Sequence, residues 1–203
     1  FNKSEFSKLI NYGLPVTLTG LLFTISNRLD VLALDYYHGV ELTGVYFGAK
    51  LLLIPVAIIS SSSYGLLISA QSRERFDSSN FNQFSLGYSS FIFLMSIFIA
   101  ILGPSLVGVV YGQKYEISLL VSAVIVMSGF VGSIRSLLTS RILSEGYSNK
   151  VLYSNAIGFF AGIFSYPLLI PNYELLGASI SFFIGTLGSF IMIFYFHRKI
   201  TLN

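Results

Sequence analysis

The amino-acid sequence predicts an all-α protein, a polytopic membrane bundle of six transmembrane helices. Only 10% of the residues are charged while 54% are hydrophobic, and the apolar residues fall in long, continuous runs. A soluble domain carries roughly 25% charged residues, so the bilayer is the solvent in which this composition is stable. Only helices and closed barrels span a bilayer. A barrel would show short alternating strands, so the continuous runs favour helices.

Six apolar stretches have the length of about 20 residues that crosses a bilayer as a helix. They cover residues 14–34, 45–70, 84–107, 117–138, 151–170 and 176–196. The connectors between them are short and polar, so we expect a single transmembrane domain over residues 1–203. The chain begins with Phe1 rather than Met, and we interpret it as an excised part of a longer protein.

The first span is apolar on one side and polar on the other when it is drawn as a helical wheel. The apolar side holds Leu18, Leu21, Leu22, Ile25, Leu29 and Leu32. The polar side holds Thr17, Thr19, Gly20, Thr24, Ser26, Asn27, Arg28 and Asp30. Such a side must face protein or water. Arg28 and Asp30 are two residues apart and point in different directions, so each needs its own partner.

Three charged residues, Arg28, Asp30 and Lys50, lie inside predicted spans, where a charge costs on the order of 2.5–3.5 kcal/mol. One interpretation is a hydrated substrate cavity formed by these residues and Asn27, in which Asp30 balances positive charge or takes up a cation. The other is structural: Asp30 forms an interhelical salt bridge with a residue such as Lys50, or Lys50 extends to the outer interface.

The later spans carry packing signals. Pro55 should kink the second span and free a carbonyl near Leu51. Pro104 and Pro171 are expected at helix ends. Small residues in the last two spans should let helices approach closely: Gly158, Gly162, Ser181, Gly185 and Ser189. Interfacial tyrosines should form an aromatic belt: Tyr36, Tyr37, Tyr46, Tyr111, Tyr115, Tyr153 and Tyr173.

Basic residues predict the orientation, because cytoplasmic connectors are enriched in lysine and arginine. The termini and the second and fourth connectors hold Lys3, Lys8, Arg73, Arg75, Arg141, Lys150, Arg198 and Lys199. The remaining connectors hold Lys114 and the acidic residues Asp35, Glu41, Glu116 and Glu174. Both ends are therefore expected in the cytoplasm. Arg135 and Arg141 are interpreted as cytoplasmic anchors or as contacts to lipid phosphate.

Other ligand classes have no support in the sequence. There is no cysteine, and the two histidines are far apart, so no metal site is expected. The net charge of +3 is small and follows the connectors, so no nucleic-acid partner is expected.

Four segments, in order along the chain, resemble the polysaccharide transporter family, the bacterial O-antigen-unit flippases of the multidrug/oligosaccharidyl-lipid/polysaccharide exporter superfamily. The first is Tyr12-Gly13-Leu14-Pro15 with Asp30, Leu34, Gly44-Val45-Tyr46, Ala49 and Pro55. The second is Gly103-Pro104-Ser105-Leu106-Val107 with Tyr111-Gly112 and Tyr115. The third is Leu143, Gly146 and Lys150, and the last is Leu176-Gly177-Ala178.

The resemblance implies the C-terminal six-helix lobe of a two-lobed flippase that alternates access across the bacterial inner (plasma) membrane. Its partners would be the missing N-terminal lobe, membrane lipids and a lipid-linked sugar substrate. That substrate is an oligosaccharide unit exported for cell-surface polysaccharide. The family's cationic cavity matches Arg28 and Lys50. No cofactor is implied, although coupling to a proton or sodium gradient stays open.

Three alternatives remain. A multidrug exporter of the same superfamily would need an acidic or aromatic cavity. A membrane enzyme of polysaccharide assembly usually needs a large catalytic loop, and these connectors are short, so we expect no enzyme. A structural subunit would leave the polar side of the first span without a purpose unless a partner helix covers it.

Overall fold

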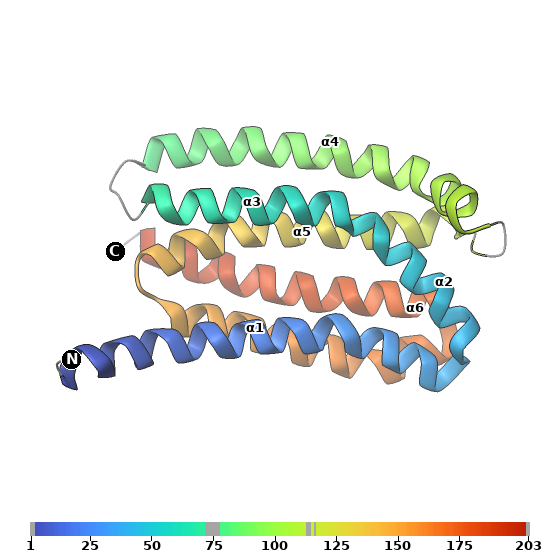
Figure 1. Ribbon diagram of the computed structural model, residues 1–203, viewed down its shortest axis with the longest axis horizontal. Coiled ribbons are helices and arrows are strands. Elements are labelled where there is room, and N and C mark those ends of the chain that lie inside the picture. Colours follow the sequence, from blue (N-terminus) through green and yellow to red (C-terminus); the bar gives the residue numbers. More distant parts are fainter. Residues whose placement is uncertain (1–2, 72–77, 113–114, 116, 202–203) are drawn as a thin grey trace.

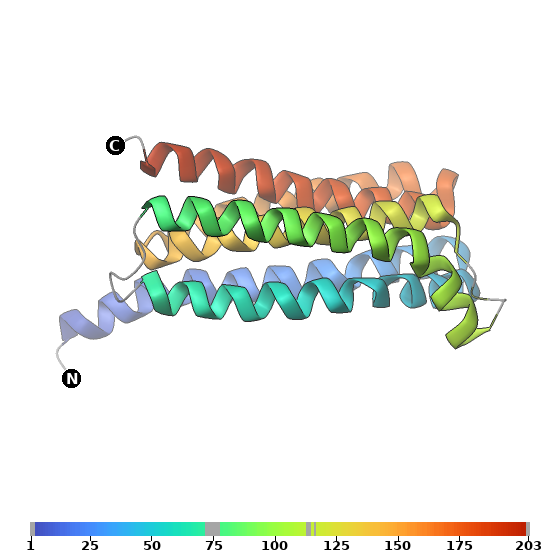
Figure 2. The ribbon, with the colours of Figure 1, turned by 90° about the horizontal axis from the view of Figure 1, so that it is seen from above.

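The computed structural model describes residues 3–71, 78–112, 115 and 117–201, and the regular structure in these ranges is all helical. In chain order the elements are α1 (Lys3–His38), α2 (Val40–Lys50), the 3₁₀ turn η1 (Leu51–Leu53), α3 (Ile54–Gln71), α4 (Ser78–Tyr111), α5 (Leu119–Ser144) and α6 (Ser148–Thr201). The long helices lie side by side in one elongated bundle (Figures 1 and 2). The predicted all-α membrane bundle is confirmed.

Five stretches are long and apolar enough to cross a membrane, and the last of them, Ser148–Ile200, is far longer than one crossing needs. It turns back at Glu174, whose φ of 48° and ψ of −124° are not helical. Figure 1 shows the two arms of α6, one orange and one red, running alongside each other. The fifth and sixth predicted spans fall on these arms, one on each.

The other predicted spans map onto helices in a simple way. The first lies within α1 and the third within α4. The second runs from α2 through η1 into α3, and the fourth begins two residues before α5. Both ends of the chain lie at the same end of the bundle (Figure 1). Of the charges used to predict orientation, Arg73, Arg75, Lys114 and Glu116 lie outside the described residues, as do the side chains of Lys3 and Lys8.

Prolines have different effects in two helices. The kink predicted at Pro55 is confirmed, because the helix breaks into η1 one turn earlier and α2 leaves α3 at an angle (Figure 1). Pro55 then occupies the first turn of α3, where its missing N–H has no helical partner to lose. The prediction that Pro104 ends a helix is wrong. The helix α4 continues through it to Tyr111 and bends near that end (Figure 2).

Small residues hold the two arms of α6 together. A Cβ atom added to Gly158 would lie 2.4 Å from the carbonyl oxygen of Gly185 and 1.9 Å from Oγ of Ser189. Only glycine allows this approach, which confirms the close packing predicted from the small residues. In lipid, helix association depends on such contacts because the bilayer is as apolar as the side chains.

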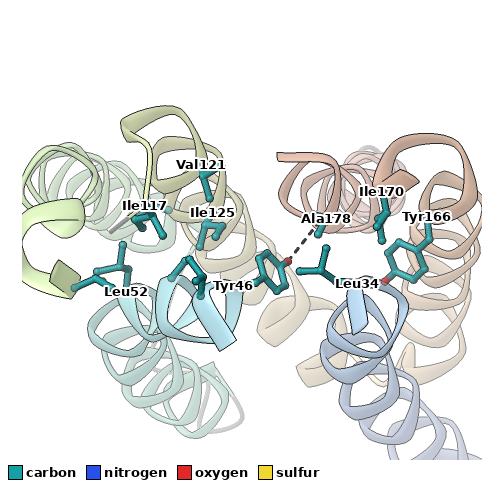
Figure 3. Close-up of a cluster of buried hydrophobic side chains, with 13 residues drawn as sticks. Leu34, Tyr46, Leu52, Ile117, Val121, Ile125, Tyr166, Ile170 and Ala178 are labelled. Atoms are coloured by element: carbon teal, nitrogen blue, oxygen red, sulfur yellow. Dashed lines mark hydrogen bonds between the residues drawn. The ribbon is translucent and has the colours of Figure 1, made fainter. Parts of the chain in front are cut away.

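The main buried cluster lies where α1, α2, α5 and α6 meet (Figure 3). Figure 1 shows α2 at the end of the bundle away from the termini. Leu34, Tyr46, Ile125, Ile170 and Ala178 form its centre, and all five are fully buried. A second cluster joins α5 to both arms of α6 near the termini. The polar part of α1 lies between these two packed regions and is described next.

Candidate functional site

The polar side of α1 divides into a buried part and an open part. Asp30 is fully buried, whereas Arg28 is exposed. The two side chains therefore leave the helix in different directions, as their spacing predicts. Two exposed polar residues are satisfied by their own helix, because the hydroxyls of Thr17 and Thr24 donate to the carbonyl oxygens of Gly13 and Gly20.

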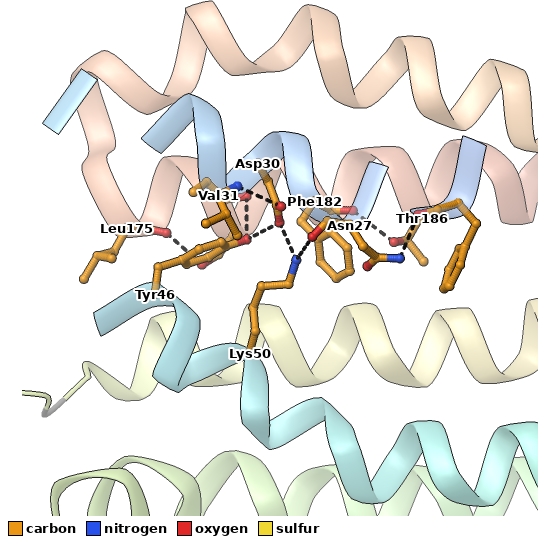
Figure 4. A network of polar contacts seen from close by, with 11 residues as sticks. Asn27, Asp30, Val31, Tyr46, Lys50, Leu175, Phe182 and Thr186 are labelled. Atoms are coloured by element: carbon orange, nitrogen blue, oxygen red, sulfur yellow. Dashed lines mark hydrogen bonds and ion pairs between the residues drawn. The ribbon is translucent and has the colours of Figure 1, made fainter. Parts of the chain in front are cut away.

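Asp30 accepts hydrogen bonds on both carboxylate oxygens. Its Oδ2 accepts from the Tyr46 hydroxyl at 2.8 Å and from Nζ of Lys50 at 2.8 Å, while Oδ1 accepts from the backbone N–H of Val31 at 2.9 Å (Figure 4). Tyr46 and Lys50 are one turn apart on α2, so a single helix face presents both donors to the carboxylate. Three donors therefore satisfy this buried carboxylate.

Lys50 is held at the end of α2, directly before the break at η1. Besides the ion pair with Asp30, its ammonium donates to the Asn27 carbonyl oxygen at 3.1 Å and lies 4.6 Å from the centre of the Phe182 ring. Its side chain is 13% exposed. The structure thus places Lys50 in an interhelical ion pair, and its chain does not extend to the outer interface.

An open hollow of about 320 Å³ lies between α1 and α2 beside this ion pair. It is lined by Phe23, Thr24, Asn27, Arg28, Val31, Phe47, Lys50 and Leu51. Two of these residues are cationic and none carries a carboxylate, because Asp30 lies behind Lys50 and not on the wall. The hollow is therefore suited to an anionic group, and its two phenylalanines supply apolar surface beside the charges.

Three of the four predicted cavity residues, Asn27, Arg28 and Lys50, meet at the wall of this hollow, and Asp30 does not. The two interpretations of the intramembrane charges therefore apply to different residues. Asp30 forms the structural salt bridge, while Arg28 and Lys50 face the space in which a ligand would lie. The amide of Asn27 donates to the Phe23 carbonyl oxygen, which fixes its side chain along α1.

Tyr46 is the residue that the sequence interpretation misplaced. It was predicted in the interfacial aromatic belt, yet it is fully buried and donates to Asp30. Its spacing of four residues from Lys50 was the available signal, because a buried carboxylate needs several donors and a helix face supplies them at that interval.

The two arginines predicted as cytoplasmic anchors or lipid-phosphate contacts lie in different surroundings. Arg141 forms a 3.5 Å ion pair with Glu145 and lies over the ring of Phe81. Arg135 is only partly exposed and lies among α1, α5 and α6, where its guanidinium donates to Oδ1 of Asn155. The structure therefore brings neither arginine into the hollow.

Comparison with known proteins gives one match. A family described as "Polysaccharide biosynthesis protein" matches residues 1–120, which include every residue that lines the hollow and the whole Asp30–Tyr46–Lys50 network. This match confirms the family resemblance found in the sequence motifs. No curated protein and no solved structure gave a match.

Proposed function

Because the chain belongs to the polysaccharide biosynthesis protein family, we propose that it is one lobe of a flippase. The flippase would move lipid-linked oligosaccharide units across the bacterial inner membrane for cell-surface polysaccharide. Its second lobe would be another six-helix unit, and the two would enclose the substrate between them. With α6 folded into two arms, the chain would cross the membrane six times. The charge pattern supports both ends in the cytoplasm.

One observation carries this proposal: an open hollow at membrane depth has two cations and no carboxylate on its wall. An unoccupied positive site inside a bilayer is costly, so such residues usually mark a substrate path. A lipid-linked sugar carries its phosphate groups next to the lipid chain. Its negative charge must cross the apolar core, and a cationic hollow lowers that cost.

In this mechanism Arg28 and Lys50 both bind the phosphate groups, in different ways. Arg28 is exposed at the wall, and its planar fork of donors suits two phosphate oxygens at once. Lys50 already donates to Asp30 and Asn27, which fixes the ammonium and leaves its remaining donor for the ligand. Asp30 acts as a positioning residue for Lys50. The sugars would fill the hollow beside Phe23 and Phe47 while the lipid tail stays in the bilayer.

The rival functions have less support. An exporter of cationic drugs needs a cavity that attracts positive charge, and beside the two phenylalanines the described lining residues offer two cations and no carboxylate. An enzyme of polysaccharide assembly needs catalytic groups facing a substrate, and Asp30 is fully enclosed by its donors. We therefore propose transport and not catalysis.

Complementation tests the proposal. The chain, and any longer gene product that contains it, is expressed in a strain that lacks its polysaccharide-unit flippase, and surface polysaccharide is measured on gels. Arg28→Ala should abolish export at normal protein level in the membrane, and Arg28→Lys should retain part of it. Lys199→Gln is the matched control, because it removes an exposed positive charge near the C-terminus, away from the hollow.

The outcomes separate the possibilities. Restoration by the longer product alone supports the two-lobed flippase, and restoration by the chain alone supports a homodimer of six-helix units. Normal export by Arg28→Ala would overturn the assignment of the hollow as the substrate site. Failure of all proteins in a panel of strains with different sugar units, despite membrane insertion, would overturn the transport proposal.

A further inference from the structure

Arg135 lies inside the predicted fourth span, three residues before its end at residue 138. It precedes the end of α5 at Ser144 by nine residues, which is about 13 Å along the helix at 1.5 Å per residue. Its hydrogen-bond partner Asn155 lies seven residues after the start of α6. Both residues of this pair lie within predicted membrane spans, residues 117–138 and 151–170.

The guanidinium of Arg135 has no counterion among the described residues. The ion pairs among those residues are Lys50–Asp30 and Arg141–Glu145. One nitrogen donates to the neutral amide oxygen of Asn155, Nε is buried without a hydrogen-bond partner, and the ring of Phe23 lies 5.7 Å from Cζ. Lys50, in contrast, has a fully buried carboxylate beside it. The structure neutralises one of these two intramembrane cations and leaves the other uncompensated.

Asn155 is held so that it presents an acceptor to Arg135. Its Nδ2 donates to the Val151 carbonyl oxygen at 2.9 Å, which directs Oδ1 toward the guanidinium. An aspartate of the same shape at this position would give a complete ion pair. The neutral amide of Asn155 instead orients the guanidinium without cancelling its charge. Such an arrangement suits a binding site in which the ligand itself supplies the anion.

Phe23 connects Arg135 with the hollow. Its ring lies over the guanidinium, and the same side chain forms part of the wall that Arg28 and Lys50 share. Phe23 also precedes Asn27 and Arg28 by about one turn of α1, on the side toward the N-terminus. The cations therefore follow one another along α1, with the uncompensated one closer to the end of the bundle that holds both termini.

We propose that Arg135 is a second phosphate-binding residue, which the anionic headgroup meets between the terminus-bearing end of the bundle and the Arg28–Lys50 hollow. This inference rests on the proposed function. A phosphate group there would supply the missing counterion and accept from the guanidinium in the bidentate manner typical of arginine. Phe23 separates the two binding points, and rotation of its side chain would open the way between them. The phosphate belongs either to the transported lipid or to an ordinary anionic phospholipid.

Binding of inorganic pyrophosphate to the full gene product, measured calorimetrically in phosphatidylcholine nanodiscs, tests this. Arg135→Gln should weaken binding about 10-fold or more, as expected for the loss of a hydrogen-bonded charge, and Arg135→Lys should restore part of it. Asn155→Asp is the decisive variant. It should weaken pyrophosphate binding, because the new carboxylate occupies Arg135; its thermal stability is measured alongside, since the variant gains an ion pair and loses the donation from Nδ2 to the Val151 carbonyl oxygen. A second set of nanodiscs containing phosphatidylglycerol shows whether phospholipid headgroups compete at Arg135, which would appear as weaker binding in the wild type but not in Arg135→Gln.

A purely structural Arg135 gives a different pattern. Asn155→Asp would then change stability and leave the affinity for pyrophosphate unchanged, and that result overturns the inference. If Arg28→Gln abolishes binding while Arg135→Gln retains wild-type affinity, the inference fails and the proposed function stands. If the wild type does not bind pyrophosphate, or Arg28→Gln binds as well as the wild type, the proposed function fails and takes the inference with it.

Discussion

The contact between the two arms of α6 predicts that the two glycines of the G-x-x-x-G motif are not equivalent. Gly158→Ala places a methyl group 1.9 Å from Oγ of Ser189 and 2.4 Å from the Gly185 carbonyl oxygen. The serine can rotate away, but the carbonyl is backbone, so the arms must separate. At Gly162 the nearest atom would lie 3.7 Å from an added Cβ, which is an ordinary contact.

The magnitudes follow from two opposing terms. Alanine is about 1 kcal/mol more favourable than glycine inside a helix. Overpacking typically costs about 1–3 kcal/mol, and a backbone clash belongs at the upper end of that range. Gly158→Ala should therefore destabilise the protein by about 1–2 kcal/mol net. Gly162→Ala should be neutral or stabilising, as should the control Gly65→Ala, where no atom lies within 4 Å of an added Cβ.

Unfolding by SDS in mixed micelles measures these differences. The chain has 13 tyrosines and no tryptophan, so tyrosine fluorescence and near-ultraviolet circular dichroism report tertiary structure. The three variants should rank with Gly158→Ala least stable. Equal stability of Gly158→Ala and Gly162→Ala would refute the argument, because it would mean that the arms do not meet at Gly158.

Three further changes test the ion-pair network and the turn. Asp30→Asn leaves the ammonium of Lys50 without its counterion and should cost about 3–5 kcal/mol in the same unfolding assay; adding Lys50→Met should recover most of the loss. Tyr46→Phe removes one charge-assisted hydrogen bond and should cost about 1.5–3 kcal/mol, and a thermal midpoint equal to that of the wild type would contradict this. Glu174→Gly should stabilise the protein by about 1 kcal/mol, because the φ of 48° disfavours a side chain, whereas Glu174→Ala should give no gain in the thermal midpoint.

The fold class could be predicted from the sequence because the bilayer imposes it. Long apolar runs have one stable form in lipid, and Pro55 acts through local sterics that do not depend on the rest of the fold. The G-x-x-x-G motif at Gly158 predicts a close helix contact, but its partners Gly185 and Ser189 are set by how the arms of α6 fold back. Pro104 shows the limit of this reasoning. Proline is tolerated inside a membrane helix when neighbouring groups satisfy the freed carbonyl, so the residue alone does not decide between a kink and a helix end.

The sequence predicts which residues of the candidate site carry charge, but not which of them pair. Composition identified Arg28, Asp30 and Lys50 as costly intramembrane charges, but their pairing depends on how α2 lies against α1. Once the turn at Gly39 brings α2 back against α1, Lys50 and Tyr46 both reach Asp30. Tyr46 was misplaced because a tyrosine near a span end satisfies the rule for the aromatic belt and the rule for a buried donor equally well.

The ion pair also bears on how a flippase site would release its substrate. Under the proposed function, Arg28 and Lys50 contribute two positive charges beside the hollow and Asp30 contributes one negative charge behind it. The net charge of the group is +1, which is less than a diphosphate would need for full neutralisation. A membrane pathway requires binding that is favourable enough for entry and weak enough for departure. Asp30 fixes the position of Lys50, and in the proposed flippase it would also limit how tightly the hollow retains an anion.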